Sequence, residues 1–373
     1  MIPLAWDALL TMVEVPARVT AMPHSRPPRY REIEASGPPR ELGRQIGEAA
    51  GEEVRAFCDM ALARVQKTCA ISREKAYDVA RRSGQFAERY RPDLVDELRG
   101  TAEAAGVELD DLLLLQVRNQ LQPEASEGCT SLSSIARGQG LVGQNWDNDP
   151  ALDAATVVIT RRPNGKPAYI SCGQAGLISY MGFNDRGVGA CVNTLPAPSR
   201  EVGTPHYFTL RELFEAGSLE EATQAVRRAE RAIPVNIMLT TPEGPADLEA
   251  SIEEVFVLRP ESHERLYHTN HCLHAQLQPH NAVFPELIQS HDREQRLRTL
   301  FAGIDGETDL AAMQQILRDH DNHPRSICRH ANSDPQYGFW ETVFSIICAP
   351  AEGQLYISRG NPCEQPYEVY SLN

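Results

Sequence analysis

The hydrophobic period of the chain changes near residue 128, and this change limits the folds that the chain can adopt. Before that point apolar residues recur at helical spacing, and helices are expected around 42–61, after Ser72, from Asp93 to Gly106 and at 110–121. After it come strand-like runs at 130–135, 141–146, 155–161, 168–171, 187–193, 236–241 and 254–258, helices at 206–216, 219–232, 291–302 and 309–320, and closing strands at 341–349 and 355–359. A doubly wound parallel sheet would alternate strand and helix strictly. This order indicates an α+β fold, with antiparallel sheets and helices layered outside them.

Charge and composition narrow the class of protein. The 373 residues carry a net charge of −15, which offers no basic footprint for nucleic acid or for an anionic membrane. No run approaches 18 consecutive apolar residues, so no membrane span is expected. Nine scattered cysteines in a chain without a recognisable secretory signal predict thiols in a reducing cytoplasm. We expect an irregular N-terminal arm over 1–30 and a single domain over 31–373.

A glycine and a cysteine stand at the head of the first strand-like run. Gly128 and Cys129 are followed by Thr130 and three serines, whereas a structural cysteine usually lies in an apolar segment. The segment 137–140 (RGQG) predicts a hairpin turn after this run. Cys129 therefore stands at the start of a hydroxyl-rich strand, in a polar setting that is unusual for a structural cysteine.

The predicted hairpin returns an acid to this cysteine. A turn centred on Gly138 and Gln139 places Thr130 opposite Asp147, and it places Cys129 opposite Asn148. A one-residue slip still leaves Asp147 beside Cys129. Aspartate and asparagine at a strand end are turn formers by default, so the register is what singles them out.

Cys129 can act without a histidine if the bond that precedes it is cut. A new α-amine on Cys129 has a reference pKa of about 7.7–8.0, against about 8.5 for the thiol, so the amine can accept the thiol proton near neutral pH. Gly128 has no side chain and permits close attack on its carbonyl. The thiol of Cys129 could attack that carbonyl, form a thioester and let water release the new N-terminus.

Several motifs together resemble one known family. They are Gly128-Cys129-Thr130 with 143–147 (GQNWD), the segment 37–47 (GPPRELGRQIG), 182–187 (GFNDRG), 193–195 (NTL), 268–271 (HTNH) and 326–330 (SICRH). In this order they resemble the penicillin acyltransferase family of N-terminal-nucleophile enzymes, from about residue 30 to the end of the chain. The arm before residue 30 has no counterpart in the family, and no acyl-CoA nucleotide-binding feature is recognisable.

The resemblance implies a four-layer αββα sandwich and self-cleavage between Gly128 and Cys129 into chains 1–128 and 129–373 that stay together as a heterodimer. It implies thioester chemistry on amides, with Cys129 as nucleophile and its new amine as base. Asp147 would orient or tune that amine. Asn270 would supply an oxyanion-hole donor, and Arg329 would complete the site by its charge.

Other interpretations remain open at this point. Amide hydrolysis is favoured over acyl-CoA-dependent N-acyl transfer, and a catalytically silent binding protein of the same fold is the alternative outside enzymes. Thr130, Asn145, His206 and Tyr207 are candidates for substrate binding, although capping and packing are the ordinary roles at the last two positions. The partner is expected to be a small amide or acyl donor, and no cofactor is expected.

A zinc hydrolase is the third hypothesis. His268, His271, Cys272 and His274 fall within seven positions, but their spacing is not that of a helical metal-binding pair, so we expect no metal there. The remaining cysteines are interpreted as small core residues or incidental thiols; they are Cys58, Cys69, Cys172, Cys191, Cys328, Cys348 and Cys363.

Overall fold

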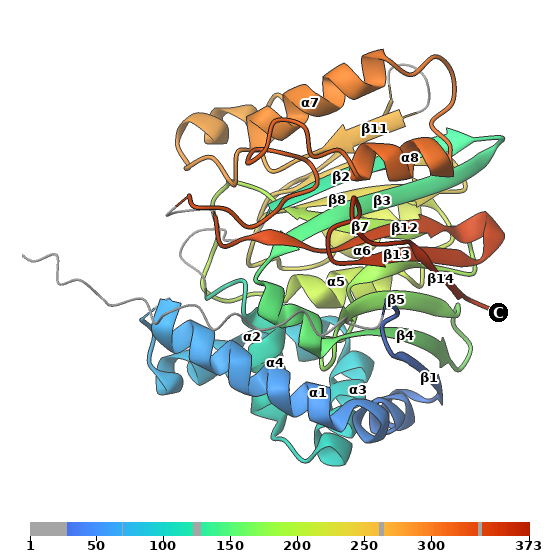
Figure 1. Cartoon of the computed structure of the whole chain (residues 1–373). Coiled ribbons are helices and arrows are strands. Elements are labelled where there is room, and N and C mark those ends of the chain that lie inside the picture. Colours follow the sequence, from blue (N-terminus) through green and yellow to red (C-terminus); the bar gives the residue numbers. More distant parts are fainter. Residues whose placement is uncertain (1–27, 69, 122–127, 261–264, 335–337) are drawn as a thin grey trace, which may run out of the picture.

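Two stacked β-sheets form the centre of the molecule, and helices cover them from both outer sides (Figure 1). This computed structural model describes residues 28–68, 70–121, 128–260, 265–334 and 338–373. The predicted α+β fold with four layers, αββα, is confirmed. Of the predicted arm at 1–30, residues 1–27 lie outside the described ranges, and so does Cys69.

The first sheet has eight strands. In spatial order they are β1 (Glu32–Gly37), β4 (Thr156–Pro163), β5 (Tyr169–Gln174), β6 (Met181–Asn184), β7 (Gly189–Thr194), β8 (Val235–Thr241), β9 (Gly244–Ala250) and β10 (Val255–Leu258). Strands β1 and β4 pair in parallel, and every other neighbouring pair is antiparallel. The sequence prediction places no strand at β1 or β9.

The second sheet has six strands and is antiparallel throughout. In spatial order they are β11 (Arg265–His268), β2 (Gly128–Ala136), β3 (Gln139–Asn148), β12 (Glu341–Ala349), β13 (Gln354–Arg359) and β14 (Glu368–Ser371). Polar side chains join the two sheets across the core. The Ser133 hydroxyl donates to the Leu239 carbonyl at 2.8 Å, and the Gln144 amide donates to the Val192 carbonyl at 2.8 Å. These buried donors are satisfied by backbone oxygens of the opposite sheet.

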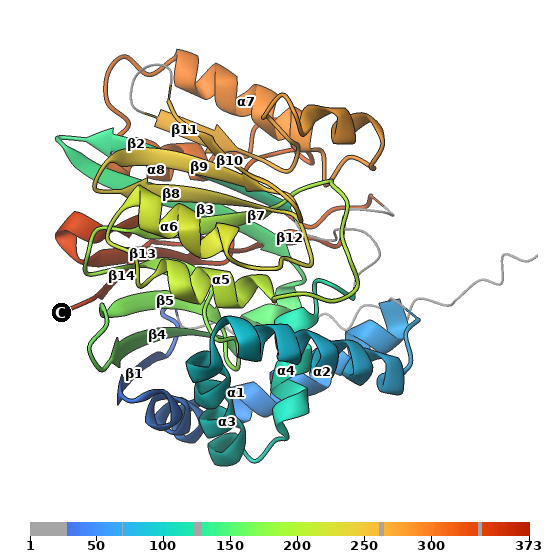
Figure 2. The same ribbon diagram turned by 180° about the vertical axis from the view of Figure 1, so that it is seen from behind.

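Three groups of helices surround the sheets (Figures 1 and 2). Helices α1 (Pro39–Thr68), α2 (Arg73–Tyr90), α3 (Pro92–Ala105) and α4 (Leu109–Val117) gather beside β1, β4 and β5; α5 (His206–Leu213) and α6 (Leu219–Arg227) cover the eight-stranded sheet; α7 (Ser290–Ala302) and α8 (Leu310–Leu317) cover the six-stranded sheet. Short 3-10 turns lie at η1 (Pro150–Ala155), η2 (Gln278–Ala282) and η3 (Pro350–Glu352). Within the described ranges, no helix combines the length and apolar composition needed to cross a bilayer.

Small residues allow α1 and α3 to pack with their backbones nearly touching. A Cβ atom on Gly43 would lie 1.8 Å from the carbonyl oxygen of Glu97, and one on Gly100 would lie 2.1 Å from that of Arg40. Any larger side chain would force the two helices apart. Gly43 and Gly47 of the 37–47 segment thus serve the packing of α1 against α3.

The six-stranded sheet has two chemically different faces. Leu132 points outward and packs with Leu297 and Phe301 of α7 and with Met313 of α8. Since strand side chains alternate between faces, Cys129 points inward, toward the core between the sheets. This alternation decides which neighbours each residue of the candidate site can reach.

Candidate active site

The β2–β3 hairpin places Asp147 opposite Gly128. The turn centres on Arg137 and Gly138, whose φ angles are 52° and 74°, and Cys129 pairs with Trp146. The predicted centre at Gly138 and Gln139 is therefore wrong by one position. A two-residue hairpin turn of type I′ has positive φ at both central residues, and here Arg137 adopts it beside the glycine.

Asp147 and Cys129 consequently extend from opposite faces of the sheet. Asp147 shares the outer face with Thr130, and Cys129 shares the inner face with Trp146. Both Cys129 and Asp147 are buried, with exposed fractions of 1% and 0%. Asp147 flanks the Gly128–Cys129 peptide through its strand position, so it can act on the backbone there.

Asn270 reaches this peptide from the segment after β11. The backbone N–H of Cys129 donates to Asn270 Oδ1 at 2.9 Å, and Asn270 Nδ2 donates to the Thr194 carbonyl at 3.1 Å. The backbone N–H of Asn270 is held by Ser290 Oγ at 2.7 Å. The structure thus brings Asn270 to Cys129, with its oxygen toward the peptide nitrogen in the uncut chain.

Arg293 on α7 is the central residue that the sequence analysis missed. It is fully buried, and it donates to the Cys129 carbonyl, to Thr130 Oγ1 at 3.0 Å and to Asn270 Oδ1 at 2.7 Å. Burial lowers the pKa of its guanidinium to about 10, although the negative charge of Asp147 acts to raise it. One signal for it exists in the sequence, because Arg293 occupies the same helical stripe as Leu297 and Phe301.

Arg329 joins the site through Thr342. The Thr342 hydroxyl donates to Asp147 Oδ1 at 2.7 Å and accepts from the Arg329 backbone N–H at 2.9 Å. The Arg329 guanidinium donates to Gln289 Oε1 at 2.7 Å. Arg329 therefore lies near Asp147, and Thr342 donates the hydrogen bond to the carboxylate.

Asp147 is a perturbed acid. Burial raises its pKa to about 6, although the charges of Arg293 and Arg329 and the Thr342 hydroxyl act in the opposite direction. Its Oδ2 atom is buried and has no hydrogen-bond partner among the described residues. A buried carboxyl with a pKa near neutrality and a spare oxygen is typical of a functional site.

A strained pair of residues covers the candidate cleavage position. Ile288 and Gln289 have φ angles of 41° and 48°, in the left-handed region that a β-branched residue rarely adopts. A Cβ on Gly128 would lie 3.2 Å from three side-chain carbons of Ile288. Gln289 in turn holds Arg329. Strain of this kind persists where surrounding contacts impose it, often at functional sites.

The other predicted substrate-binding residues have structural contacts. Asn145 Nδ2 donates to the carbonyls of Leu317 and Ile327 at 2.8 and 3.1 Å, and thus fastens the end of α8 to β3. Tyr207 accepts from Arg118 at 2.8 Å, and His206 packs on its ring. Their roles toward a substrate stay predictions.

A pocket lies beside the end of β3. Its lining combines apolar side chains with two arginines and one acid: Phe57, Met60, Ala61, Arg64, Val65, Arg118, Asp149 and Leu152. Arg64 donates to Asn148 Oδ1 at 3.4 Å, directly after Asp147 in the chain. Three aromatic rings connect the pocket with the strand position of Cys129. Tyr207 binds Arg118 of the lining, and its ring centroid lies 5.5 Å from that of Tyr180. The Tyr180 centroid lies 5.9 Å from that of Trp146, which pairs with Cys129.

The histidine cluster near 268–274 has other contacts. His268 Nε2 lies 2.8 Å from Glu249, and His271 Nδ1 lies 2.8 Å from Ser290 Oγ. Among the described residues, three or more potential ligands come together in a different place, at Cys328, His330 and Cys363. The sequence analysis interpreted Cys328 and Cys363 as core residues or incidental thiols, and it did not foresee that their sulfurs lie next to each other.

The chain is similar to several known proteins. Over 347 residues the chain is 28% identical to the acyl-coenzyme A:6-aminopenicillanic-acid-acyltransferase 40 kDa form of Emericella nidulans, covering 91% of this chain and 95% of that one. The structure of penicillin V acylase from Agrobacterium tumefaciens aligns with a TM-score of 0.45 at 12% identity, over 65% of this chain and 86% of that one. A variant of conjugated bile acid hydrolase from Clostridium perfringens aligns with a TM-score of 0.40 at 13% identity, over 66% and 97%.

The decisive match is to a family profile. The profile described as acyl-coenzyme A:6-aminopenicillanic acid acyl-transferase covers residues 136–364, which is more than half of the chain. That span includes Asp147, Asn270 and Arg329, and it begins seven positions after Cys129. The chain therefore belongs to the acyl-coenzyme A:6-aminopenicillanic acid acyl-transferase family.

Proposed function

We propose that this protein is a self-processing thiol enzyme that cleaves or transfers an acyl group on a small amide through a thioester on Cys129. The observation that carries the proposal is the buried Gly128–Cys129 peptide. Its N–H is bound by Asn270, the next carbonyl is bound by Arg293, and Asp147 lies opposite on the neighbouring strand. Buried, oriented polar groups around one peptide are what a pre-organised reaction centre requires.

The proposed maturation step needs no cofactor. The Cys129 thiol attacks the Gly128 carbonyl carbon, the C–N bond breaks, and the thiol proton moves to the departing amine nitrogen. Water then hydrolyses the thioester, which leaves a carboxylate on Gly128 and a free thiol and α-amine on Cys129. Asp147 would orient the new ammonium or amine through its Oδ2 atom, for which the described residues offer no hydrogen-bond partner.

The same residues would then process a substrate. The α-amine of Cys129 accepts the thiol proton, the thiolate attacks the substrate acyl carbon, and the amine proton passes to the leaving group. Asn270 can stabilise the oxyanion if its Nδ2 turns from Thr194 once the peptide N–H is gone. Arg293 keeps Asn270 and the Cys129 carbonyl in place during the maturation step.

The two cleavage products are expected to remain associated. The segment before residue 128 supplies β1 to the eight-stranded sheet, and it supplies α4, whose Leu112 and Leu115 pack over Gly176. These contacts bury apolar surface between the two pieces, so separation would expose a large core.

The substrate class is proposed from the pocket and from the family. The pocket beside Asn148 offers apolar walls for an acyl chain, which suits amide hydrolysis of acylated amines. Transfer from an acyl-CoA is the second candidate, because the Emericella relative bears an acyl-coenzyme A acyltransferase name. Arg64 and Arg118 in the pocket would suit an anionic donor.

Denaturing mass spectrometry tests the maturation step. The 41.4 kDa chain should convert into pieces of 128 and 245 residues, and Cys129→Ala should remain intact and inactive. Cys172→Ala, at another buried cysteine on β5, is the matched control and should mature normally. An intact wild-type chain after prolonged incubation contradicts self-cleavage.

Failure of an acylating thiol probe to label Cys129 favours a silent binding protein. A panel of amides and acyl-CoA thioesters then separates hydrolysis from transfer.

A further inference from the structure

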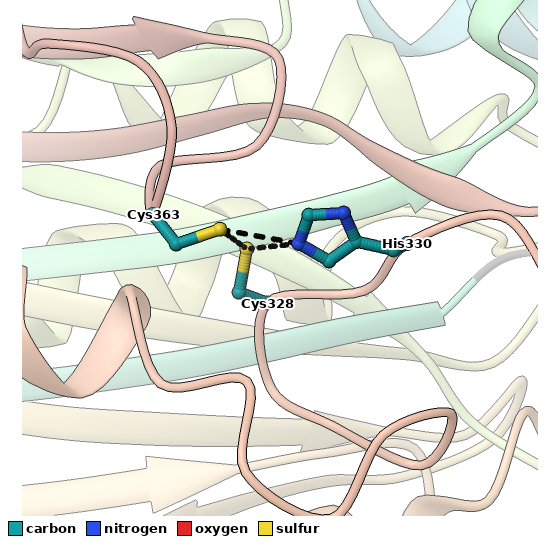
Figure 3. A group of neighbouring side chains, drawn as sticks. All are labelled: Cys328, His330 and Cys363. Carbon is teal, nitrogen blue, oxygen red and sulfur yellow. Dashed lines mark hydrogen bonds between the residues drawn. The ribbon is translucent and has the colours of Figure 1, made fainter.

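Three soft or borderline ligand groups meet outside the proposed reaction centre (Figure 3). Cys328 and His330 come from the segment between α8 and β12, and Cys363 follows β13. The Cys328 and Cys363 sulfurs are 3.5 Å apart, and His330 Nε2 is 3.8 Å from the first and 3.1 Å from the second. Cys328 is buried, and the other two are half-buried. We call this set the Cys-His-Cys cluster.

The distances fit the edges of a tetrahedral metal site. Metal–sulfur bonds of about 2.3 Å and metal–nitrogen bonds of about 2.0–2.1 Å place the sulfurs about 3.8 Å apart and each sulfur about 3.5 Å from the nitrogen. The observed edges of 3.5, 3.8 and 3.1 Å lie within a few tenths of an ångström of these values. One ion can therefore contact all three atoms after a small rotation of the half-buried side chains.

Neighbouring groups are placed as they are around metal ligands. Asn361 Nδ2 lies 3.6 Å from Cys328 Sγ as a donor, and it also donates to the Arg329 carbonyl at 2.6 Å. The Glu364 carboxylate lies 3.9 Å from His330 Nδ1, on the side of the ring away from the sulfurs. N–H donors to thiolate sulfur, and a carboxylate behind a ligating imidazole, orient and strengthen metal ligands.

We propose that the Cys-His-Cys cluster binds one zinc ion through Cys328 Sγ, Cys363 Sγ and His330 Nε2, with water as the fourth ligand. Two thiolates and an imidazole favour zinc over the harder cations that prefer oxygen. Binding releases the two thiol protons to solvent, so the affinity falls with falling pH. The proposal does not depend on chemistry at Cys129.

The proposed ion would brace the segment that carries Arg329. The backbone of Arg329 is bound on both sides, its N–H to Thr342 Oγ1 and its carbonyl to the Thr342 N–H at 2.9 Å. Cys328 and His330 flank this residue, and Thr342 binds Asp147. Zinc would join 328–330 to Cys363 and so hold Thr342 and Asp147 in register from outside the site.

Zinc content of the purified full chain tests the proposal. After reduction, reconstitution with zinc and removal of excess metal, the wild type should hold one zinc per chain by elemental analysis. Cys363→Ser and His330→Ala should each hold less than a tenth of that. Cys58→Ser, at another half-buried cysteine, is the matched control and should bind as the wild type does. Zinc should raise the Tm of the wild type and of Cys58→Ser only.

Cobalt(II) gives a second readout that does not depend on activity. The wild type loaded with cobalt should show thiolate-to-cobalt charge-transfer bands and tetrahedral d–d bands, and Cys363→Ser should lose the thiolate bands. Equal zinc content in the wild type and Cys363→Ser overturns the proposal. A Cys328–Cys363 disulfide in chains purified with zinc present also overturns it, because the close sulfurs would then serve a redox pair.

Discussion

Asp147 lies directly opposite Gly128 across the β2–β3 ladder, while its carboxyl and the Cys129 thiol extend from opposite faces of the sheet. The acid is therefore next to the Gly128–Cys129 peptide without lying against the sulfur. This geometry suits an acid that acts on the backbone nitrogen of Cys129. Arg293, Thr342 and Arg329 all act to lower the pKa of this acid.

Arg293 should be needed for maturation because it fastens the peptide to Asn270. Replacement by methionine removes donors from the Cys129 carbonyl and from Asn270 Oδ1, and it leaves Arg329 as the remaining buried counter-charge of Asp147. Loss of one partner of a buried, hydrogen-bonded charge should reduce the free energy of unfolding by about 3–5 kcal/mol. We expect Arg293→Met to fall at least tenfold in cleavage rate, measured by denaturing mass spectrometry over time.

One further variant separates charge from geometry at position 293, and a second variant on the same helix is its control. Arg293→Lys keeps the charge but cannot reproduce the forked contacts, so it should mature more slowly than the wild type and faster than Arg293→Met. Arg298→Lys, on an exposed position of the same helix, should mature at the wild-type rate. Normal maturation of Arg293→Met would show that this residue serves the fold alone.

Asp147 should make stability depend on pH in a defined window. Its folded-state pKa of about 6 lies above the reference value of 3.8, so the folded state binds more protons than the unfolded state between about pH 4 and 6. The contribution of Asp147 to the free energy of unfolding is therefore greatest below this window, and it falls as pH rises through the window. In an uncut Cys129→Ala background, Asp147→Asn should gain Tm relative to its parent as pH rises from 4 to 7.

Thr342→Val supplies the companion measurement. The Thr342 hydroxyl donates to Asp147 and acts to lower its pKa, so its removal should shift the pH window upward. Valine has nearly the same shape, which keeps the packing. A Tm difference between Asp147→Asn and its parent that is constant from pH 4 to 7 would contradict the raised pKa.

Local sequence patterns predicted more of the fold than of the contacts that assemble the site. The predicted hairpin put Asp147 on the same face of the sheet as Thr130, and the structure has it there because face depends only on strand period. The exact pairing depended on Arg137 adopting positive φ, which no propensity of arginine indicates.

Long-range contacts account for the rest. Arg293 is 164 positions from Cys129, and Cys363 is 35 positions from Cys328, so neither pair leaves a spacing signal. The resemblance to a known family supplied Asn270 and Arg329, which local pattern alone would have left as a turn residue and a surface charge. In the structure, Asn270 contacts the Cys129 N–H, and Arg329 contacts Thr342, which binds Asp147.

Gly128 should be required by the space beneath Ile288. A Cβ on Gly128 would meet three Ile288 carbons at 3.2 Å, and Ile288 is already held at positive φ. Gly128→Ala should therefore slow maturation at least tenfold, because the scissile carbonyl is pushed out of place. Adding Ile288→Ala should restore most of the rate, and Ile288→Ala alone serves as the control. If the double variant is as slow as Gly128→Ala, the requirement lies in the chemistry of glycine and not in the space.

The pocket beside β3 should set the acyl-chain preference without affecting maturation. Ala61 is a small residue of its lining, and Ala61→Phe would fill space against Val65 and Leu152. Each methylene that loses its apolar contact weakens binding by about 0.8 kcal/mol, or roughly fourfold. A series of acyl amides of increasing length should show kcat/KM falling for long chains only, while mass spectrometry shows normal cleavage before Cys129. An equal fall for every chain length would place the acyl group elsewhere.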